Sequence, residues 1–171
     1  MPRHVAFLRG VSPLNARMPA LAASFVAAGF GNVRTVLSSG NVVFDAEGED
    51  ERALERRAEA AMSAHLGRSF FTIVRAAARL DALLADDPYA RHGIPRDARR
   101  VVSFLRDDAA PRVALPLARD HASVFCQRGR EVFTAYVPIG KGPVFMRLIE
   151  RAFGDEITTR TWETVARCAA A

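Results

Sequence analysis

The spacing of apolar residues in the first half of the chain predicts alternating strands and helices. Leu21, Phe25 and Ala28 recur at helical spacing behind Pro19, and proline is favoured in the first turn of a helix. Gly40 lies between two β-rich runs, where a tight hairpin needs a positive φ angle. The predicted order is strand 3–8, a helix closed by Gly29, strands 33–37 and 41–44, a helix that starts with Glu49, Asp50 and Glu51 and ends at Gly67, strand 70–74, and a short helix at 80–85.

A similar order begins again in the second half. Residues 88–99 are rich in proline, glycine and charge, which predicts a connector between two halves. Two passes through one order of elements indicate an internal duplication. The predicted segments after the connector are strand 101–105, a weak helix at 111–117, strands 123–126 and 132–137 around Gly129, a helix from Pro143 to Gly154, a short strand near Ile157 and a last helix that carries Trp162 and Val165.

Strand, helix, strand, strand, helix, strand is the ferredoxin-like arrangement. The sequence therefore predicts an α+β fold made of two ferredoxin-like βαββαβ units with antiparallel sheets. We expect the first unit at residues 1–87, the connector at 88–99 and the second unit, with a C-terminal helix, at 100–171. In this topology the strands take the spatial order 4-1-3-2, so the end of strand one, the start of helix one and the turn between strands two and three meet at one edge.

That edge of the first unit gathers polar residues that suit a small anionic metabolite or a nucleotide. A helix start offers backbone N–H groups and partial positive charge, and Arg9 with nearby Ser and Asn side chains adds donors for a phosphate or carboxylate. Ordinary turn chemistry explains the same residues, because Gly supplies a positive φ, Ser and Asn bond to the local backbone, and Arg9 forms a structural ion pair. The candidate ligand-binding residues are Arg9, Asn15, Ser38, Ser39, Gly40 and Asn41.

Four runs of residues resemble one bacterial family. They are FLRGV at residues 7–11, NARMP at 15–19, GFGNVRTVLSSGNVVF at 29–44 and TTRTWETV at 158–165. On these runs, nearly the whole chain resembles the family catalogued as domain of unknown function 1697. The resemblance implies a paired ferredoxin-like fold and a soluble bacterial protein of unknown function. It implies no reaction.

The composition is that of a globular protein. The chain has 171 residues, half of them apolar, which is enough to bury a core without a metal or a disulfide. Cys126 and Cys168 show neither disulfide-framework nor zinc-ligand spacing, so a reducing compartment fits best. No leader pattern or membrane-length apolar run is present. We therefore expect a cytoplasmic protein with no metal, cofactor or membrane partner; monomer and homo-oligomer both stay open.

The positive charge raises the question of nucleic-acid binding. The net charge is +5 and the pI is near 10.2, but nearly every basic residue is arginine, a bias that a GC-rich coding sequence explains better than phosphate binding. RNA-binding sheets of this kind stack bases on exposed aromatics, whereas Phe133 and Tyr136 alternate onto opposite faces. Nucleic acid is thus a less favoured partner than a small anion. A module that assembles through a sheet edge is the third class.

Three residues outside the edge are secondary candidates. Arg160 and Trp162 flank the start of the last helix and together suit a planar ligand, although we favour a core role for Trp162 because it shares a helical stripe with Val165. Lys141 lies in a loop that lacks the full phosphate-loop spacing. The sequence contains no recognisable spacing of nucleophile, base or metal ligands, so the catalytic residues are unknown and enzymatic activity stays open.

Overall fold

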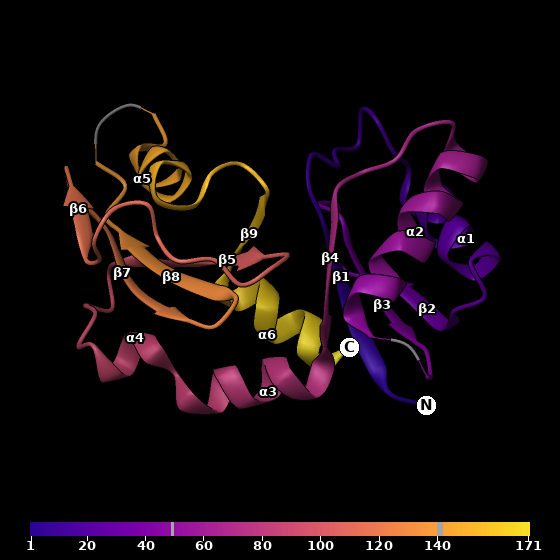
Figure 1. Cartoon of the computed structure of the whole chain (residues 1–171), viewed down its shortest axis with the longest axis horizontal. Coiled ribbons are helices and arrows are strands. Elements are labelled where there is room, and N and C mark those ends of the chain that lie inside the picture. The colour runs from indigo at the N-terminus through magenta and orange to yellow at the C-terminus, as the bar shows by residue number, and fades with distance from the viewer. Residues whose placement is uncertain (49, 140–141) are drawn as a thin grey trace. The chain divides into compact units, whose positions relative to one another are not determined.

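The computed structural model describes residues 1–48, 50–139 and 142–171. The chain divides into two compact units, one made of Met1–Ala82 with Val165–Ala171 and the other of Leu83–Thr164. Each unit contains an antiparallel sheet and helices (Figure 1), so the α+β class predicted from the sequence is confirmed. No helix among these described residues is long and apolar enough to cross a membrane.

The first unit follows the order strand, helix, strand, strand, helix, strand. Its elements are β1 (Arg3–Leu8), α1 (Met18–Ala27), β2 (Gly31–Thr35), β3 (Asn41–Asp45), α2 (Glu51–Leu66) and β4 (Thr72–Ala76), after which comes α3 (Ala77–Asp86). The strands lie in the order β2-β3-β1-β4 with every neighbouring pair antiparallel. Read from the other side, this is the 4-1-3-2 order that the sequence predicts for the first unit.

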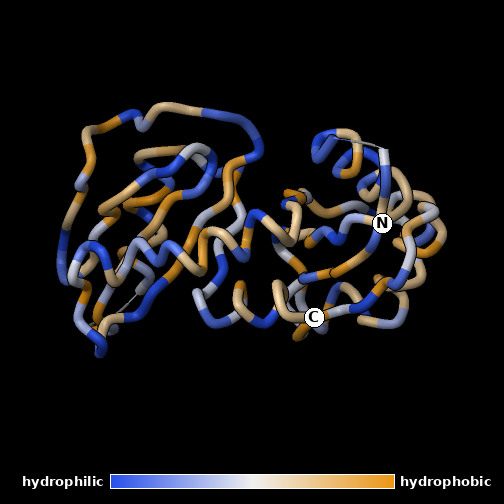
Figure 2. Tube along the Cα trace, turned by 90° about the horizontal axis from the view of Figure 1, so that it is seen from below, coloured by the Kyte–Doolittle hydropathy of each residue, from blue (hydrophilic) through white to orange (hydrophobic). Residues whose placement is uncertain are grey.

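Helices α1 and α2 cover one face of the first sheet (Figure 1). Phe25 of α1 and Leu54 of α2 are fully buried there, and the Phe25 ring lies 5.7 Å from that of Phe44 on β3. Figure 2 shows hydrophobic and hydrophilic positions closely interleaved along the helical turns, as expected for helices that bury one side. Alternate strand residues form the other side of this core, namely Ala6, Leu8, Val42, Phe44 and Val74.

Capping residues stabilise both ends of α2. Before the helix, the Asp50 carboxylate accepts a hydrogen bond of 2.7 Å from the backbone N–H of Ala53. After it, Gly67 adopts a left-handed conformation with a φ of 72°, which is the common way to end a helix. The other predicted first-turn acid, Glu49, lies outside the described residues.

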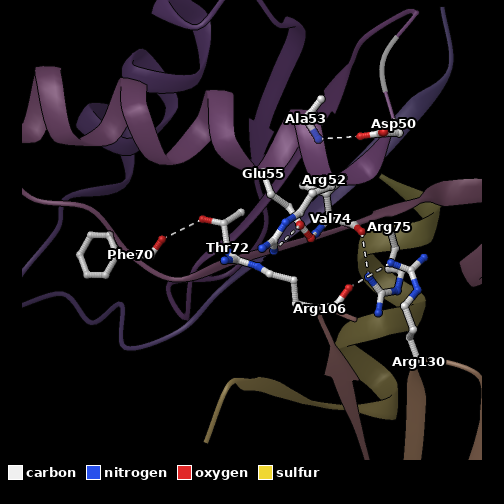
Figure 3. Close-up of polar contacts among 10 residues, drawn as sticks. All are labelled: Asp50, Arg52, Ala53, Glu55, Phe70, Thr72, Val74, Arg75, Arg106 and Arg130. Carbon is white, nitrogen blue, oxygen red and sulfur yellow. Dashed lines mark hydrogen bonds and ion pairs between the residues drawn. The ribbon is translucent and has the colours of Figure 1, made fainter. Parts of the chain in front are cut away.

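Two glutamates of α2 accept hydrogen bonds from backbone N–H groups of β4, and Figure 3 shows the contact of Glu55 with Val74. Glu55 accepts from the N–H of Val74 at 2.9 Å, and Glu51 accepts from the N–H of Ala76 at 2.9 Å. Four residues of helix rise about 6 Å and two residues of strand about 6.6 Å, so the two carboxylates match alternate N–H groups of the strand. The Glu55 side chain is only 1% exposed and lies 3.6 Å from Arg52.

The second unit contains a five-stranded sheet. The elements that follow α3 are α4 (Pro88–Arg91), β5 (Arg99–Leu105), β6 (Leu117–Arg119), β7 (Ala122–Arg128), β8 (Glu131–Tyr136), α5 (Val144–Phe153), β9 (Ile157–Thr161) and α6 (Trp162–Ala170), whose residues from Val165 onward belong to the first unit. The sheet order is β6-β7-β8-β5-β9. A short helix, α4, lies within the predicted connector, and β6 is an edge strand that the sequence analysis does not predict.

The weak helix predicted at residues 111–117 is wrong. Those residues form bends and lead into β6, so no helix separates β5 from β7. Pro116 explains the failure, because proline donates no N–H and also disfavours helical backbone angles at Leu115. The short apolar run that indicates a helix in the sequence instead places Leu115 and Leu117 against the core beneath α5.

We predict that Glu55→Ala lowers the free energy of unfolding by about 2 kcal/mol, because it leaves a buried backbone N–H at Val74 without an acceptor. Chemical denaturation of the two proteins measures the difference. Arg56→Ala, at the adjacent and exposed position of α2, is the matched control and should change stability by no more than about 0.5 kcal/mol. Equal stabilities for the two variants would show that the Glu55 contact contributes nothing.

Candidate functional site

The structure brings the end of β1 and the turn between β2 and β3 together. The N–H of Leu8 donates to the carbonyl oxygen of Gly40 at 2.8 Å, and the N–H of Arg9 donates to that of Phe71 at 2.9 Å. Arg9 is half-buried, whereas Ser38 and Ser39 are exposed at the tip of the turn. Arg9 and the turn therefore share one edge of the first sheet, where the sequence analysis expects them.

Both asparagines of this edge hydrogen-bond within their own loops. The Asn15 side-chain amide donates to the carbonyl oxygen of Gly10 at 2.7 Å, and its oxygen accepts from the N–H of Ser12 at 2.8 Å. The buried Asn41 amide donates to the carbonyl oxygen of Val36 at 2.9 Å and to the Ser39 hydroxyl at 3.1 Å. These bonds shape the two loops, as turn chemistry would, and they occupy donors that an anion would need.

Gly40 fills a position that no other residue fits easily. Its φ of 90° lies in the left-handed region, and a Cβ atom there would lie 2.9 Å from the Cβ of Val11 and 3.1 Å from that of Leu8. The positive φ predicted from the hairpin is confirmed. The close contact with Val11 explains how the loop after β1 stays packed against the turn.

Of the secondary candidates, Trp162 lies in the core. Trp162 is 8% exposed and packs edge to face against Tyr89, with ring centroids 5.1 Å apart, and against Phe133 at 6.0 Å. The Arg160 guanidinium donates to the carbonyl oxygen of Thr159 at 2.9 Å. Lys141 lies outside the described residues. The Trp162 ring is thus part of the core of the second unit.

A polar pocket of about 460 Å³ opens in the second unit, at the start of β5. Arg99 and Arg100 are the first residues of β5 and pair with Tyr136 and Ala135 of β8. Because successive strand residues point to opposite faces, the two arginines flank the sheet. Arg96 joins them from the preceding loop, and the rest of the lining is Asp97, Ala98, Val101, Tyr136, Pro138, Thr161 and Glu163. We call this the arginine pocket.

The arginine side chains of the arginine pocket are available to bind an external anion. Among the described residues, the guanidinium groups of Arg96, Arg99 and Arg100 make no hydrogen bond or ion pair. Asp97 and Glu163 are the carboxylates in the lining. Sequence reasoning does not find this pocket, because Thr161 and Glu163, which also line it, come from a distant part of the chain.

Tyr89 has a structural role beside the first residues of β5. Its hydroxyl donates to the carbonyl oxygen of Val101, and burial raises the pKa of Tyr89 far above its ordinary value. The hydroxyl therefore stays protonated and keeps this hydrogen bond at any physiological pH. The first residues of β5 are held in place as a result.

The two cysteines and the acidic residues show no catalytic arrangement. Burial raises the pKa of Cys126, which disfavours the reactive thiolate, and neither Cys126 nor Cys168 is in a disulfide. Within residues 1–48, 50–139 and 142–171, no three His, Cys, Asp or Glu side chains gather as a metal site.

The comparisons with known proteins identify the family. A family model described as "Protein of unknown function (DUF1697)" matches residues 1–133. The chain belongs to the DUF1697 family. This confirms the family that the sequence runs indicate: three of the four runs lie inside the match, and the run at 158–165 lies beyond it. The match includes both the edge around Arg9 and the three arginines of the pocket.

Among solved structures, the chain is similar to a conserved bacterial protein from Streptococcus pneumoniae. The two share 17% sequence identity with a TM-score of 0.75, and the similarity covers 99% of this chain and 97% of that one. At this identity the likeness shows the fold alone. No curated protein matches the chain.

For this DUF1697 protein we predict that Gly40→Ala costs about 2 kcal/mol more stability than Gly10→Ala, because overpacking against Val11 and Leu8 adds to the strain of a positive φ. Gly10 is the matched control, since its φ is 83° and a Cβ there meets no atom within 4 Å. Thermal or urea unfolding of both variants gives the comparison. Equal losses would mean that Val11 moves aside without cost.

Proposed function

We propose that this protein binds a small anionic metabolite in the arginine pocket. The observation that carries the proposal is a pocket of about 460 Å³ whose three arginine guanidinium groups have no hydrogen-bonding or ion-pair partner among the described residues. Its volume falls within the range of roughly 300 to 1,000 Å³ that is usual for small-molecule sites. A phosphate or carboxylate would supply the missing acceptors.

Arginine suits this task better than lysine would. A guanidinium group presents several N–H donors in one plane, so it can bind a carboxylate or phosphate through two parallel hydrogen bonds. Arg100 is half-buried, and a partly buried charge is screened less by water and salt than an exposed one. Asp97 and Glu163 at the rim would repel a ligand of high charge, which favours a ligand with one anionic group.

The edge formed by Arg9, Asn15 and residues 38–41 stays a prediction for the same function. Its two asparagine amides already serve their own loops, at 2.7 Å from Gly10 and 2.9 Å from Val36. A ligand there would have to compete with those bonds. We therefore place the arginine pocket first and treat the edge as the competing location.

The nucleic-acid alternative has less support. Phe44 and Phe133, which would have to stack on bases, are fully buried, and Phe133 contacts Tyr89 and Trp162. Base stacking needs an accessible ring face. The net charge of +5 favours nucleic acid, but a net charge indicates weak, salt-dependent attraction and not a specific binding site.

The third alternative is a module that assembles with other chains, and light scattering at several protein concentrations tests it.

We also infer that the second unit is a diverged copy of the first. The order β9-β5-β8-β7 corresponds to β4-β1-β3-β2 when β6 is regarded as an added edge strand. On this inference, the second unit has lost the helix that a ferredoxin-like unit has between the strands that correspond to β5 and β7. The domain limits, with units at residues 1–87 and 100–171 and a connector at 88–99, stay a prediction. Separate expression of residues 1–87 and of residues 100–171, followed by circular dichroism of each, tests them.

The binding test uses isothermal titration calorimetry of the full chain with inorganic phosphate, acetate and AMP as probes, each of which carries a single anionic group. We expect at least one to bind, and Arg99→Gln/Arg100→Gln to weaken that binding at least tenfold through loss of the charge-assisted hydrogen bonds. The control Arg56→Gln/Arg167→Gln removes the same charge from two exposed helical positions and should change affinity less than twofold.

Two results decide between the locations. If Arg9→Ala loses binding while Arg99→Gln/Arg100→Gln binds normally, the site lies at the predicted edge and the proposal for the arginine pocket is wrong. Equal loss in the pocket variant and in the control would mean that the probes respond only to net charge. Either result would overturn the proposed site.

A further inference from the structure

A second pocket lies next to the arginine pocket. It has a volume of about 450 Å³ and shares Ala98 and Tyr136 with the arginine pocket. Its lining is mainly apolar and includes Ile94, Pro95, Ala135 and Val137. We call it the apolar groove. Two hollows of similar size, one basic and one apolar, therefore adjoin at the same end of the second sheet.

The strand register explains why the sheet is hollow there. Ala118 of β6 pairs with Ser123 of β7, Ser123 pairs with Ala135 of β8, and Ala135 pairs with Arg100 of β5. Directly paired residues project on the same face of a sheet. Three small side chains thus lie in a row across β6, β7 and β8, and the row ends at an arginine. The floor of the apolar groove leads to the guanidinium of Arg100.

The side wall of the groove is held in a defined shape. Asp120 and His121 form the two-residue turn between β6 and β7, with φ angles of 47° and 68°. Positive φ at both central residues is the hairpin geometry that matches strand twist. The N–H of Val137 donates to the carbonyl oxygen of His121 at 2.9 Å, which ties the turn to the end of β8. A preformed wall lowers the ordering cost of binding.

We propose that the ligand is amphipathic, with one carboxylate or phosphate bound at Arg100 in the arginine pocket and an unbranched apolar body lying in the apolar groove. This inference rests on the proposed function, because it needs the arginine pocket to bind the anion. Charge complementarity fixes the orientation, since the basic end of the row accepts the acid. An anion without an apolar body would leave the apolar groove unused.

Binding of a series of straight-chain carboxylates tests the proposal. Butanoate, hexanoate, octanoate and decanoate are titrated into the full chain, below the concentrations at which they aggregate. Burial of each methylene in the groove should strengthen binding about threefold to fourfold until the groove is full. The variant Ala118→Phe, at an exposed position of β6 in the groove, should abolish that dependence on chain length. Ala60→Phe, at an exposed position of α2, should leave it unchanged.

The outcomes separate the two proposals. A flat chain-length series, together with a probe anion whose binding requires Arg99 and Arg100, would overturn the amphipathic ligand and leave the proposed function standing. A chain-length dependence that survives in Ala118→Phe would place the apolar body elsewhere and also overturn it. If Ala118→Phe unfolds, Ser123→Leu fills the same row from β7 and replaces it. Absence of binding by every anion tested would overturn both proposals.

Discussion

The register of β5 against β8 determines what the second unit can present to a ligand. Arg99 faces Tyr136 and Arg100 faces Ala135 in this pairing. A slip of one residue would exchange the faces of every side chain on β5, because side chains alternate along a strand. Arg100 would then leave the face of Ala118 and Ser123. The basic pocket and the apolar groove adjoin only in the observed register, so both proposals for function depend on it.

The first unit follows closely from local patterns in the sequence. Leu54 recurs with other apolar residues at helical spacing in α2, and Gly40 and Gly67 lie where the chain needs positive φ angles. Each of these signals involves residues close together in the sequence. That is why the strands, helices and turn of this unit are found without the structure, and why the edge beside Arg9 is placed correctly in the sheet.

In the second unit, local sequence patterns do not predict every element or the pocket. Leu115 and Leu117 lie at positions that are compatible with a helix, but Pro116 between them directs the chain into an edge strand that packs under α5. The arginine pocket is missed for another reason. Arg99 is near Arg96 in the sequence, whereas Thr161 and Glu163 reach the pocket only through the pairing of β5 with β9, in which Val101 faces Thr161. Long-range strand pairing carries no local signal.

The glutamates on the edge of β4 have a consequence for the behaviour of the protein in a crowded solution. An open strand edge is a template on which another chain can polymerise. Glu51 and Glu55 act there as an added strand would, because they accept the outward N–H groups of Ala76 and Val74. At the opposite edge, an irregular register between Gly31 and Arg34 interrupts β2. The first sheet is thereby protected on both sides from growth into fibres.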